Sequence, residues 1–504
     1  MSRKVRTAIL GAGFGGVAAA HALLECGQDD FVILERGDRP GGVWRANTYP
    51  GIACDVPSVV YSLSFAPNPQ WTRRFSPGDE IQGYLLDVMR RFALNKHVRV
   101  NADVVRARFD DASGRWRLEL ADGETLEAEV LISACGQLTR PAVPTLPGLD
   151  RFQGQWFHSA HWPEGKKLDG ARVAVVGTGA SAIQFAPSIA PTVEHMAIFQ
   201  RSAPWVIPKL DTKYGRVTRW LYARFPRLQR IARRFWQVQL ESLAPVFTRQ
   251  PPVRARVMRA LFTKLAAFQR FIQLRGNRRL IETATPDYAM GCKRVLLTMD
   301  WYPTLRRRNV EVFTSPIREV VSDGVVTEDG THHEVDTIIF GTGFTATEFL
   351  APMEVVGRDG VSIREAWKDG AEAFLGITVP EFPNMFILYG PNTNHGTGSA
   401  IEVIEVQARY AAQGVELLAN DEAEQLEVRR EVHETFSREL QERLRGSVWA
   451  DCASWYITES GRVTNNWPGT FEEYRQRAGR PSLADYSTAR PTQFPHSEDA
   501  QRVS

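Results

Sequence analysis

The sequence TAILGAGFGGVAAAHALLE, residues 7–25, decides the fold of this chain. Residues 7–10 are typical of a buried strand, the run G-x-G-x-x-G follows, and a helix-forming segment comes next. In this context Gly11 makes a tight turn, Gly13 lets the backbone approach a pyrophosphate, and Gly16 lets helix and strand pack closely. The stretch predicts a dinucleotide-binding unit; a turn that only serves the fold is the alternative.

An acidic residue follows this first glycine turn at the spacing typical of a dinucleotide-binding unit. A second strand is expected at residues 31–34 and ends at Glu35, 24 positions after Gly11. A carboxylate at this place can accept hydrogen bonds from the ribose hydroxyls of an adenosine. The two strands and the acid together favour cofactor binding over a purely structural turn.

A second glycine turn occurs in the middle of the chain. Residues 172–176 form another apolar strand, and GTGASA follows at residues 177–182, with Gly177 and Gly179 in the first two glycine positions. Alanine replaces the third glycine, which the fingerprint allows. We therefore expect two Rossmann-like domains in an α/β fold.

The two turns differ in the charge that follows them. The residue 24 positions after Gly177 is Arg201, where the first unit has Glu35, and Ser202 can add a hydrogen bond. A carboxylate repels a 2′-phosphate, whereas a guanidinium binds it with two parallel hydrogen bonds. The first unit should therefore hold FAD or NAD and the second NADPH. Together they indicate a flavin that is reduced by NADPH.

Bulk properties set limits on partners and location. A chain of 504 residues with 43% hydrophobic residues suits several globular domains, and its formal charge of +3 by itself argues for no particular partner. No nucleic-acid partner is expected. The N-terminus runs directly into the first strand without a signal peptide, which predicts a cytoplasmic protein. No apolar run approaches the roughly 18 to 20 residues needed to span a bilayer.

The cysteines exclude two classes of function. They are isolated in sequence, without the C-x-x-C spacing of a metal site or a redox-active disulfide. We therefore expect no metal, and the pattern argues against a disulfide reductase. The five residues are Cys26, Cys54, Cys135, Cys292 and Cys452.

Two loops carry candidate charged residues. Residues 41–58 are rich in Gly, Pro and aromatic residues and predict a long ordered loop that contains Asp55. If buried, Asp55 needs a cationic or hydrogen-bonding partner; the alternative is a turn-forming residue before Pro57. Lys293 and Arg294 are expected in a loop of the second nucleotide domain, where one could meet the nucleotide phosphate and the other the active site. A solvated surface pair is the alternative.

A basic helical region interrupts the α/β pattern. Between residues 213 and 280, Glu241 is the only acidic residue among many arginines, and residues 220–240 have the apolar spacing of an amphipathic helix. The favoured interpretation is an insertion that packs its apolar stripe and solvates its charges. A helix that makes weak contact with a membrane surface is the alternative. Either would lie near the entrance for a lipophilic substrate.

A stretch between the two glycine turns carries a resemblance to a known family. FQGQWFHSAHWP, residues 152–163, matches the pattern F-x-G-x-x-x-H-x-x-x-W-P, and GGVWRANTYPGIACD, residues 41–55, matches G-G-x-W-x-x-x-x-Y-P-G-x-x-x-D. Over nearly the whole chain these motifs resemble the type I Baeyer–Villiger monooxygenases of the class B flavoprotein monooxygenases. The related N- and S-oxygenating flavin enzymes usually have Tyr or Phe in place of Trp162 and lack the Asp signature.

The resemblance assigns roles to several of these residues. It implies that Arg294 is the catalytic arginine beside the flavin, that Asp55 is its carboxylate partner, and that Lys293 and Arg201 hold the NADPH 2′-phosphate. Further residues expected to contact the cofactors are Phe14, Gly42, Trp44, Tyr61, Val104, Gln137, Ala180, Ser181 and Asn394.

The 152–163 motif itself is expected to be a linker. Its histidines resemble catalytic bases, but the implied chemistry needs no base there. The family pattern is defined by Phe152, Gly154, His158 and Trp162, and the resemblance implies that His158 and Trp162 couple domain movement to the reaction.

The implied reaction is a Baeyer–Villiger oxidation with NADPH and dioxygen. A flavin C4a-peroxide attacks a ketone only as the anion, so a fixed cation such as Arg294 is needed beside it, and the product is an ester or lactone. The expected substrate is a lipophilic ketone, and the protein should be a monomer or homodimer. The alternatives are an S- or N-oxygenating flavin monooxygenase, or a flavoprotein that acts as an NADPH oxidase.

The expected domain organisation follows from the positions of the two turns and the helical region. The FAD-binding domain should comprise residues 1–150 and 346–477, the NADPH-binding domain residues 151–209 and 287–345, the helical insertion residues 210–286, and a loosely ordered C-terminal tail residues 478–504.

Overall fold

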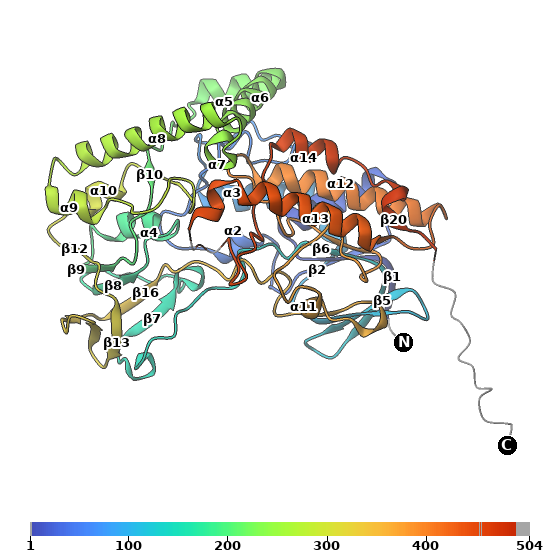
Figure 1. Cartoon of the computed structure of the whole chain (residues 1–504), viewed down its shortest axis with the longest axis horizontal. Coiled ribbons are helices and arrows are strands. Elements are labelled where there is room, and N and C mark those ends of the chain that lie inside the picture. The colour runs from blue at the N-terminus through green and yellow to red at the C-terminus, as the bar shows by residue number, and fades with distance from the viewer. Residues whose placement is uncertain (1–2, 453, 455, 490–504) are drawn as a thin grey trace.

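The computed structural model describes residues 3–452, 454 and 456–489. It has the expected α/β architecture, with two large sheets, three smaller ones and a helical layer along one edge (Figure 1). The first glycine turn belongs to one sheet and the second to the other.

The first sheet has eight strands, of which β6, β1, β2 and β3 pair in parallel. Thr7 pairs with Phe31 and Val130, so β1 is central and its C-terminal half is buried. The segment near residue 386 adds a parallel strand beside β6. This sheet therefore contains strands from both the first and the last third of the chain. In spatial order the strands are β17 (Glu354–Val356), β4 (Val104–Asp110), β5 (Arg115–Leu120), β6 (Thr125–Ser133), β1 (Arg3–Leu10), β2 (Phe31–Leu34) and β3 (Val98–Arg99), with β18 (Met385–Ile387) paired to β6.

The second sheet has five strands, all paired in parallel. Its strands are β12 (Val310–Phe313), β9 (His195–Phe199), β8 (Arg172–Val176), β16 (Thr337–Phe340) and β7 (Gln155–His158). Strand β7 lies inside the 152–163 motif, which is therefore an edge strand of this sheet followed by a 3-10 turn at Ser159–His161. A small antiparallel sheet is inserted between β12 and β16, and consists of β13 (Ile317–Val321), β14 (Gly324–Thr327) and β15 (His332–Glu334).

Helices cover both sheets. Helix α1 packs against α12, and both helices are largely buried. The helices are α1 (Phe14–Glu25), α2 (Val43–Ala46), α3 (Gly78–Arg91), α4 (Ala182–Ile189), α10 (Trp301–Leu305), α11 (Ile363–Ala366), α12 (Ala400–Ala419), α13 (Arg430–Arg445) and α14 (Phe471–Arg477).

The helical insertion is present, but it is oriented differently from the favoured expectation. Its helices are α5 (Arg216–Arg224), α6 (Pro226–Ser242), α7 (Pro245–Thr248), α8 (Pro252–Gln273) and α9 (Arg278–Thr283), and the short strands β10 (Val206–Ile207) and β11 (Leu296–Leu297) pair at its base. The apolar stripe of α6 does not pack: Ile231 and Phe235 are more than half exposed. The expectation of a packed apolar stripe is therefore wrong.

The C-terminal region and the cysteines also differ from the sequence analysis. The expected loose tail is packed as far as residue 489, because β20 (Tyr486–Ser487) pairs with β19 (Glu427–Val428) and the buried Tyr486 hydroxyl contacts that of Tyr410 at 2.6 Å. Residues 490–504 lie outside the described residues. Cys292 and Cys452, isolated in sequence, form a disulfide.

The first glycine turn predicts a measurable effect on stability. A Cβ atom on Gly16 would lie 1.9 Å from the Gly11 carbonyl oxygen, so Gly16→Ala should destabilise the protein by about 1–3 kcal/mol, the usual cost of overpacking. Thermal unfolding measures this as a lower Tm. Gly83→Ala is the matched control: Gly83 lies in α3 with open space around its Cα, so its Tm should stay equal or rise. Equal losses in both variants would contradict this explanation.

Candidate active site

A single large cavity of about 2350 Å³ joins the two glycine turns. Its wall includes the predicted charged residues Glu35, Asp55 and Arg201 together with Lys293 and Arg294. It also includes these predicted cofactor residues: Gly11, Gly13, Phe14, Gly42, Trp44, Tyr61, Val104, Gln137, Gly177, Gly179, Ala180, Ser181, Ser202 and Asn394. Segments more than 300 residues apart therefore meet at one site.

The first turn presents backbone to this cavity. Gly13 precedes α1, whose first turn contains no acidic residue, so its N–H groups and positive dipole end favour an anion. A Cβ atom on Gly42 would lie 3.0 Å from the Gly13 Cα, which shows how closely the two backbones approach. Glu35 is fixed at the cavity wall because its carboxylate accepts hydrogen bonds from Ala12 N and Gly37 N, each at 2.8 Å.

Aromatic and amide side chains line the part of the cavity next to the first sheet. Trp44 Nε1 donates to the Tyr61 hydroxyl at 3.0 Å, and the Tyr61 ring packs edge-on against Phe14 with centroids 5.6 Å apart. Tyr61 and Trp44 thereby fix each other's orientation. This contact joins the 41–58 loop to the start of α1.

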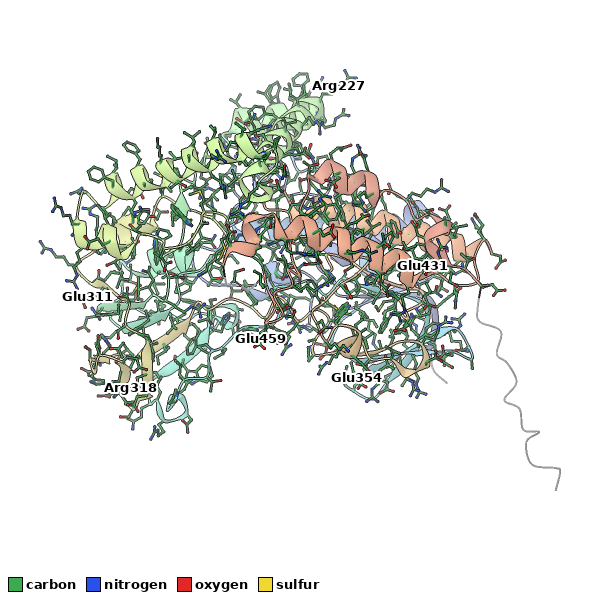
Figure 2. All side chains as sticks on the ribbon, viewed as in Figure 1. Arg227, Glu311, Arg318, Glu354, Glu431 and Glu459 are labelled. Carbon is green, nitrogen blue, oxygen red and sulfur yellow. A yellow bond between two sulfur atoms is a disulfide. The ribbon has the colours of Figure 1, made fainter. Side chains whose placement is uncertain are left out.

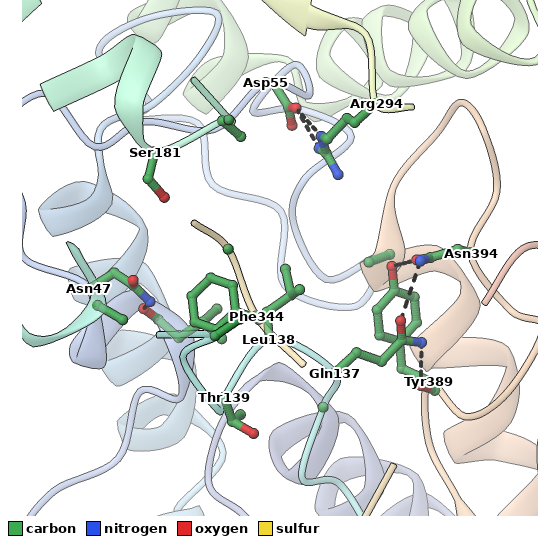
Figure 3. Close-up of a pocket in the computed structure, with 18 of the residues that line it drawn as sticks. Asn47, Asp55, Gln137, Leu138, Thr139, Ser181, Arg294, Phe344, Tyr389 and Asn394 are labelled. Carbon is green, nitrogen blue, oxygen red and sulfur yellow. Dashed lines mark hydrogen bonds and ion pairs between the residues drawn. The ribbon is translucent and has the colours of Figure 1, made fainter. Parts of the chain in front are cut away.

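A network of amides forms a second wall (Figure 3). Gln137 Nε2 donates to the Tyr389 carbonyl at 2.8 Å, and Gln137 Oε1 accepts from Asn394 Nδ2 at 3.3 Å. The Tyr389 hydroxyl donates to Asn394 Oδ1, and Asn465 Nδ2 donates to the same Gln137 oxygen at 3.2 Å. The network ties the segment after β6 to the loop before α12. Tyr389 and Asn465 were not predicted, because turn residues alone gave no sign of these long-range contacts.

Asp55 and Arg294 meet at the cavity (Figure 3). Arg294 Nε lies 3.2 Å from Asp55 Oδ2, and Nη2 donates to the same oxygen. Arg294 keeps 47% of its side chain exposed and Asp55 keeps 27%, so the guanidinium has free N–H groups on the cavity side. Asp55 thus has a cationic partner, as one interpretation of the sequence required.

The ion pair stays charged. Burial raises the pKa of the Asp55 carboxyl, but the charge and hydrogen bonds of Arg294 outweigh it, and the pKa lies below its usual value. The Asp55 charge raises the pKa of Arg294 further above its usual value. Arg294 is therefore a permanent cation at any working pH.

Burial also shifts the pKa values of three other titratable groups near the ion pair. Burial raises the pKa of Tyr456 to about 12 and also raises that of Tyr389, so both phenols are neutral beside Arg294. Burial lowers the pKa of Lys209, while the nearby Asp55 acts in the opposite direction. Lys209, Tyr389 and Tyr456 were missed from sequence, since nothing in their local spacing indicates a site.

The second turn gathers the cations expected to bind a phosphate. Arg201 is exposed, and Lys293 Nζ donates to Ser202 Oγ at 3.0 Å while it lies 4.5 Å from the centroid of the Tyr288 ring. Burial first, and then the charge of Arg201, lower the pKa of Lys293. The effect of Arg201 on the pKa of Lys293 indicates that the two positive charges lie near each other.

The 152–163 motif is packed behind the cavity. Phe152 and His158 are buried and do not line it, and neither does Gly154, whose added Cβ would lie 2.4 Å from the Asp336 carbonyl oxygen. Trp162 reaches the cavity wall from the same motif. Gly16 does not line the cavity either, because it packs against the Gly11 backbone.

His158 is not equipped to act as a base. Its Nδ1 accepts a hydrogen bond from Ala160 N at 3.1 Å, and its ring lies edge-on to Phe344 with centroids 5.7 Å apart. Burial lowers the pKa of His158 to about 4, so it is neutral near pH 7. Strand β7 pairs His158 with Phe340, so His158 is part of the packing at the edge of the second sheet.

Two features are absent from the part of the chain that the structure describes. Within the ranges 3–452 and 456–489, no helix combines the length and the hydropathy needed to cross a bilayer. No group of three His, Cys, Asp or Glu side chains in the same part of the chain is arranged to bind a metal ion.

Comparison with known proteins assigns the family. Residues 4–235 match the flavin-binding monooxygenase-like family. A Baeyer–Villiger monooxygenase from Streptomyces coelicolor is 42% identical over 493 residues, which cover 97% of this chain and 93% of that protein. This chain belongs to the Baeyer–Villiger monooxygenase family.

Solved structures agree with the Baeyer–Villiger family assignment. The closed crystal structure of cyclohexanone monooxygenase has a TM-score of 0.85 at 26% identity, and the match covers 97% of this chain and 100% of that one. Oxidized steroid monooxygenase bound to NADP has a TM-score of 0.83 at 30% identity, covering 94% of this chain and 97% of that one.

The Asp55–Arg294 pair predicts how stability depends on pH. The pKa of Asp55 is lower in the folded protein than in the unfolded chain, so the pair stabilises the fold above about pH 4 and loses this contribution as pH falls through the folded pKa. Asp55→Asn should lower Tm by a constant amount between pH 6 and pH 8, and the difference from wild type should shrink on acidification. A difference that grows as the pH is lowered would contradict the ion pair.

Proposed function

We propose that this protein uses NADPH, FAD and dioxygen to insert one oxygen atom next to a ketone carbonyl, giving an ester or a lactone. The observation that carries the proposal is that Arg294, held by Asp55, faces a cavity bounded by two dinucleotide-type turns. The similarity to Baeyer–Villiger monooxygenases supports the same reaction class.

The first turn fits FAD. The Glu35 carboxylate lies at the wall of the cavity and suits the ribose hydroxyls of the adenosine, and Gly13 and Gly42 leave the backbone open where a pyrophosphate would lie. The amide network of Gln137 and Asn394 would face the ring system. Each of these groups is neutral or suited to a 2′-hydroxyl, which supports FAD over a 2′-phosphorylated cofactor at this turn.

The second turn fits NADPH. Arg201, Ser202 and Lys293 provide two cations and a hydroxyl at one place, which is the donor set that a 2′-phosphate requires. The structure of steroid monooxygenase bound to NADP, from a relative at 30% identity, supports this assignment.

The residues around the pair would control charge during oxygen transfer. When bound, FAD reduced by NADPH supplies activated dioxygen. Arg294 would hold a positive charge beside the negative charge that develops on the reacting oxygens, which is the largest single contribution available in a partly dry site. Asp55 would orient the guanidinium and moderate its charge. Tyr456 remains protonated near pH 7 and does not compete for the cation.

The insertion side of the cavity is apolar. Leu243, Val246 and Phe247 line it from the segment around α7, and Leu240 and Phe262 line it from α6 and α8. We propose that a lipophilic ketone binds against these side chains, since apolar walls with few polar groups are typical of small-molecule sites.

The test is product analysis with purified protein, FAD, NADPH, oxygen and a panel of cyclic, aryl and long-chain ketones. We expect an ester or lactone in proportion to the NADPH consumed, and a loss of at least about 100-fold in that product with Arg294→Ala. Sulfide oxidation should survive the same substitution better, because it does not require the anionic oxidant. NADPH consumption that yields only hydrogen peroxide from every ketone would overturn the proposal in favour of an oxidase.

The NADPH site gives a second prediction. Arg201→Ala should raise KM for NADPH by about 10- to 100-fold, which corresponds to one charge-assisted hydrogen bond of about 1.5–3 kcal/mol, and should leave KM for NADH nearly unchanged. Steady-state kinetics with both nucleotides measures this. Arg318→Ala, at an exposed arginine that does not line the cavity, is the control. An equal rise for NADH would show that Arg201 does not meet the 2′-phosphate.

The family motif gives a third prediction. His158→Ala should lower kcat and the ratio of product formed to NADPH consumed, because it loosens the edge strand of the sheet that carries the second glycine turn, while FAD remains bound. Flavin absorbance after gel filtration and product yield per NADPH measure the two effects. Loss of FAD from this variant would mean that the residue serves only the fold.

A further inference from the structure

Helices α6 and α8 turn apolar side chains toward solvent. On each helix these residues recur every three or four positions and form one stripe, and both stripes lie along the outer edge of the molecule, where side chains project away from the protein (Figure 2). The residues, which we call the outer apolar surface, are Leu228, Ile231, Phe235 and Val238 of α6 and Val253, Val257, Leu261, Leu265, Phe268 and Ile272 of α8, each between 41% and 76% exposed.

This orientation is fixed by polar contacts on the inner side of the helices. On α6, Gln229 Nε2 donates to the Asn68 carbonyl at 2.6 Å, and Arg233 Nη1 donates to the Ser62 carbonyl at 2.8 Å. The Arg233 guanidinium also lies 3.8 Å from the buried Glu405 carboxylate.

Helix α8 is anchored in the same manner. The buried Gln269 donates through Nε2 to the Thr298 carbonyl at 2.8 Å, and Gln273 donates to the Met299 carbonyl at 3.0 Å. Polar side chains therefore anchor both helices to the protein while an apolar stripe on each faces solvent, whereas an ordinary surface helix buries its apolar stripe. Rotating either helix to bury its stripe would break these hydrogen bonds.

The outer apolar surface lies in a strongly basic region. Residues 213–280 contain 17 Lys and Arg and a single acidic residue, Glu241, while the whole chain has a net charge of only +3. Exposed arginines flank the stripe of α6 at positions 227, 230 and 234, and Arg227 lies at the extreme edge in Figure 2. Apolar residues with flanking arginines are the composition of helices that lie in the interface of a lipid bilayer.

We propose that the outer apolar surface docks onto an anionic lipid bilayer, with α6 and α8 lying in the interface plane. Charge decides between the possible occupants. A second copy of this chain would bring one basic surface against another, which is repulsive, whereas anionic headgroups neutralise the arginines while the acyl boundary covers the apolar side chains.

Docking in this orientation would connect the bilayer to the cavity. The same insertion presents Leu240, Leu243 and Phe262 to the cavity wall. A lipophilic ketone dissolved in the bilayer would then enter through the insertion. This last step rests on the proposed function, whereas the docking itself does not.

The test is sedimentation of the full, FAD-loaded chain with vesicles. We expect binding to vesicles of equal parts phosphatidylcholine and phosphatidylglycerol, weaker binding to pure phosphatidylcholine, and weaker binding at high salt. The double variant Leu261→Gln/Phe268→Gln should bind the anionic vesicles at least about 10-fold more weakly, because two large apolar side chains are removed. Its control is Val100→Gln/Leu483→Gln, two exposed apolar residues outside the insertion, which should bind like wild type.

The charge component needs its own variants. Replacing Arg227, Arg230 and Arg234 by Gln should weaken binding to anionic vesicles by at least about 10-fold and leave binding to pure phosphatidylcholine unchanged. The control replaces three exposed arginines on other elements, Arg108, Arg117 and Arg318, by Gln and should have no effect. Equal Tm values in all variants confirm that the fold is intact, since every substituted side chain is exposed.

Three results would overturn the proposal. One is no binding to anionic vesicles at low salt. Another is binding that Leu261→Gln/Phe268→Gln retains in full. The third is concentration-dependent self-association that this variant abolishes, without vesicle binding, which would assign the outer apolar surface to a second copy of the chain. Ketone oxidation measured without lipid is independent of all three, so failure of docking and failure of the proposed function are distinguishable.

Discussion

The ion pair of Asp55 and Arg294 is the contact on which the site depends. The two residues are 239 positions apart, one in the loop that follows α2 and the other in the segment that precedes β11. Burial alone would raise the pKa of the Asp55 carboxyl, and the facing guanidinium contributes most to keeping it below its usual value. The pair therefore forms only when the elements around the first sheet and those around the second are docked together.

The two sheets contribute different chemistry to the same cavity. Each has a glycine turn at the end of a central parallel strand, but Glu35 follows one turn and Arg201 the other, so each selects a different nucleotide under the proposed function. Arg294 lies between them because its loop leaves the helical insertion and returns to the second sheet. The insertion thus sets both the position of the cation and the apolar wall next to it.

Local sequence signals predicted much of this arrangement. The features that depend on contacts between residues far apart in the sequence could not be predicted. The glycine turns, Glu35 and Arg201 were predictable because their spacing is fixed within one βαβ unit, and Arg294 was reached through the family resemblance. The outward stripe of α6 was not predictable: its period of three to four residues defines a face, but partners such as Ser62, about 170 positions away, decide where that face points. The Cys292–Cys452 disulfide escaped for the same reason, with 160 residues between its ends.

A double-mutant cycle on Asp55 and Arg294 tests the central claim most directly. It compares ketone-dependent kcat/KM of wild type, Asp55→Ala, Arg294→Ala and the double variant. If Asp55 acts by holding Arg294, the double variant should be no slower than Arg294→Ala alone, so the effects are far from additive. Additive losses would show that the two residues act independently, and would contradict an account in which one ion pair joins the two halves of the site.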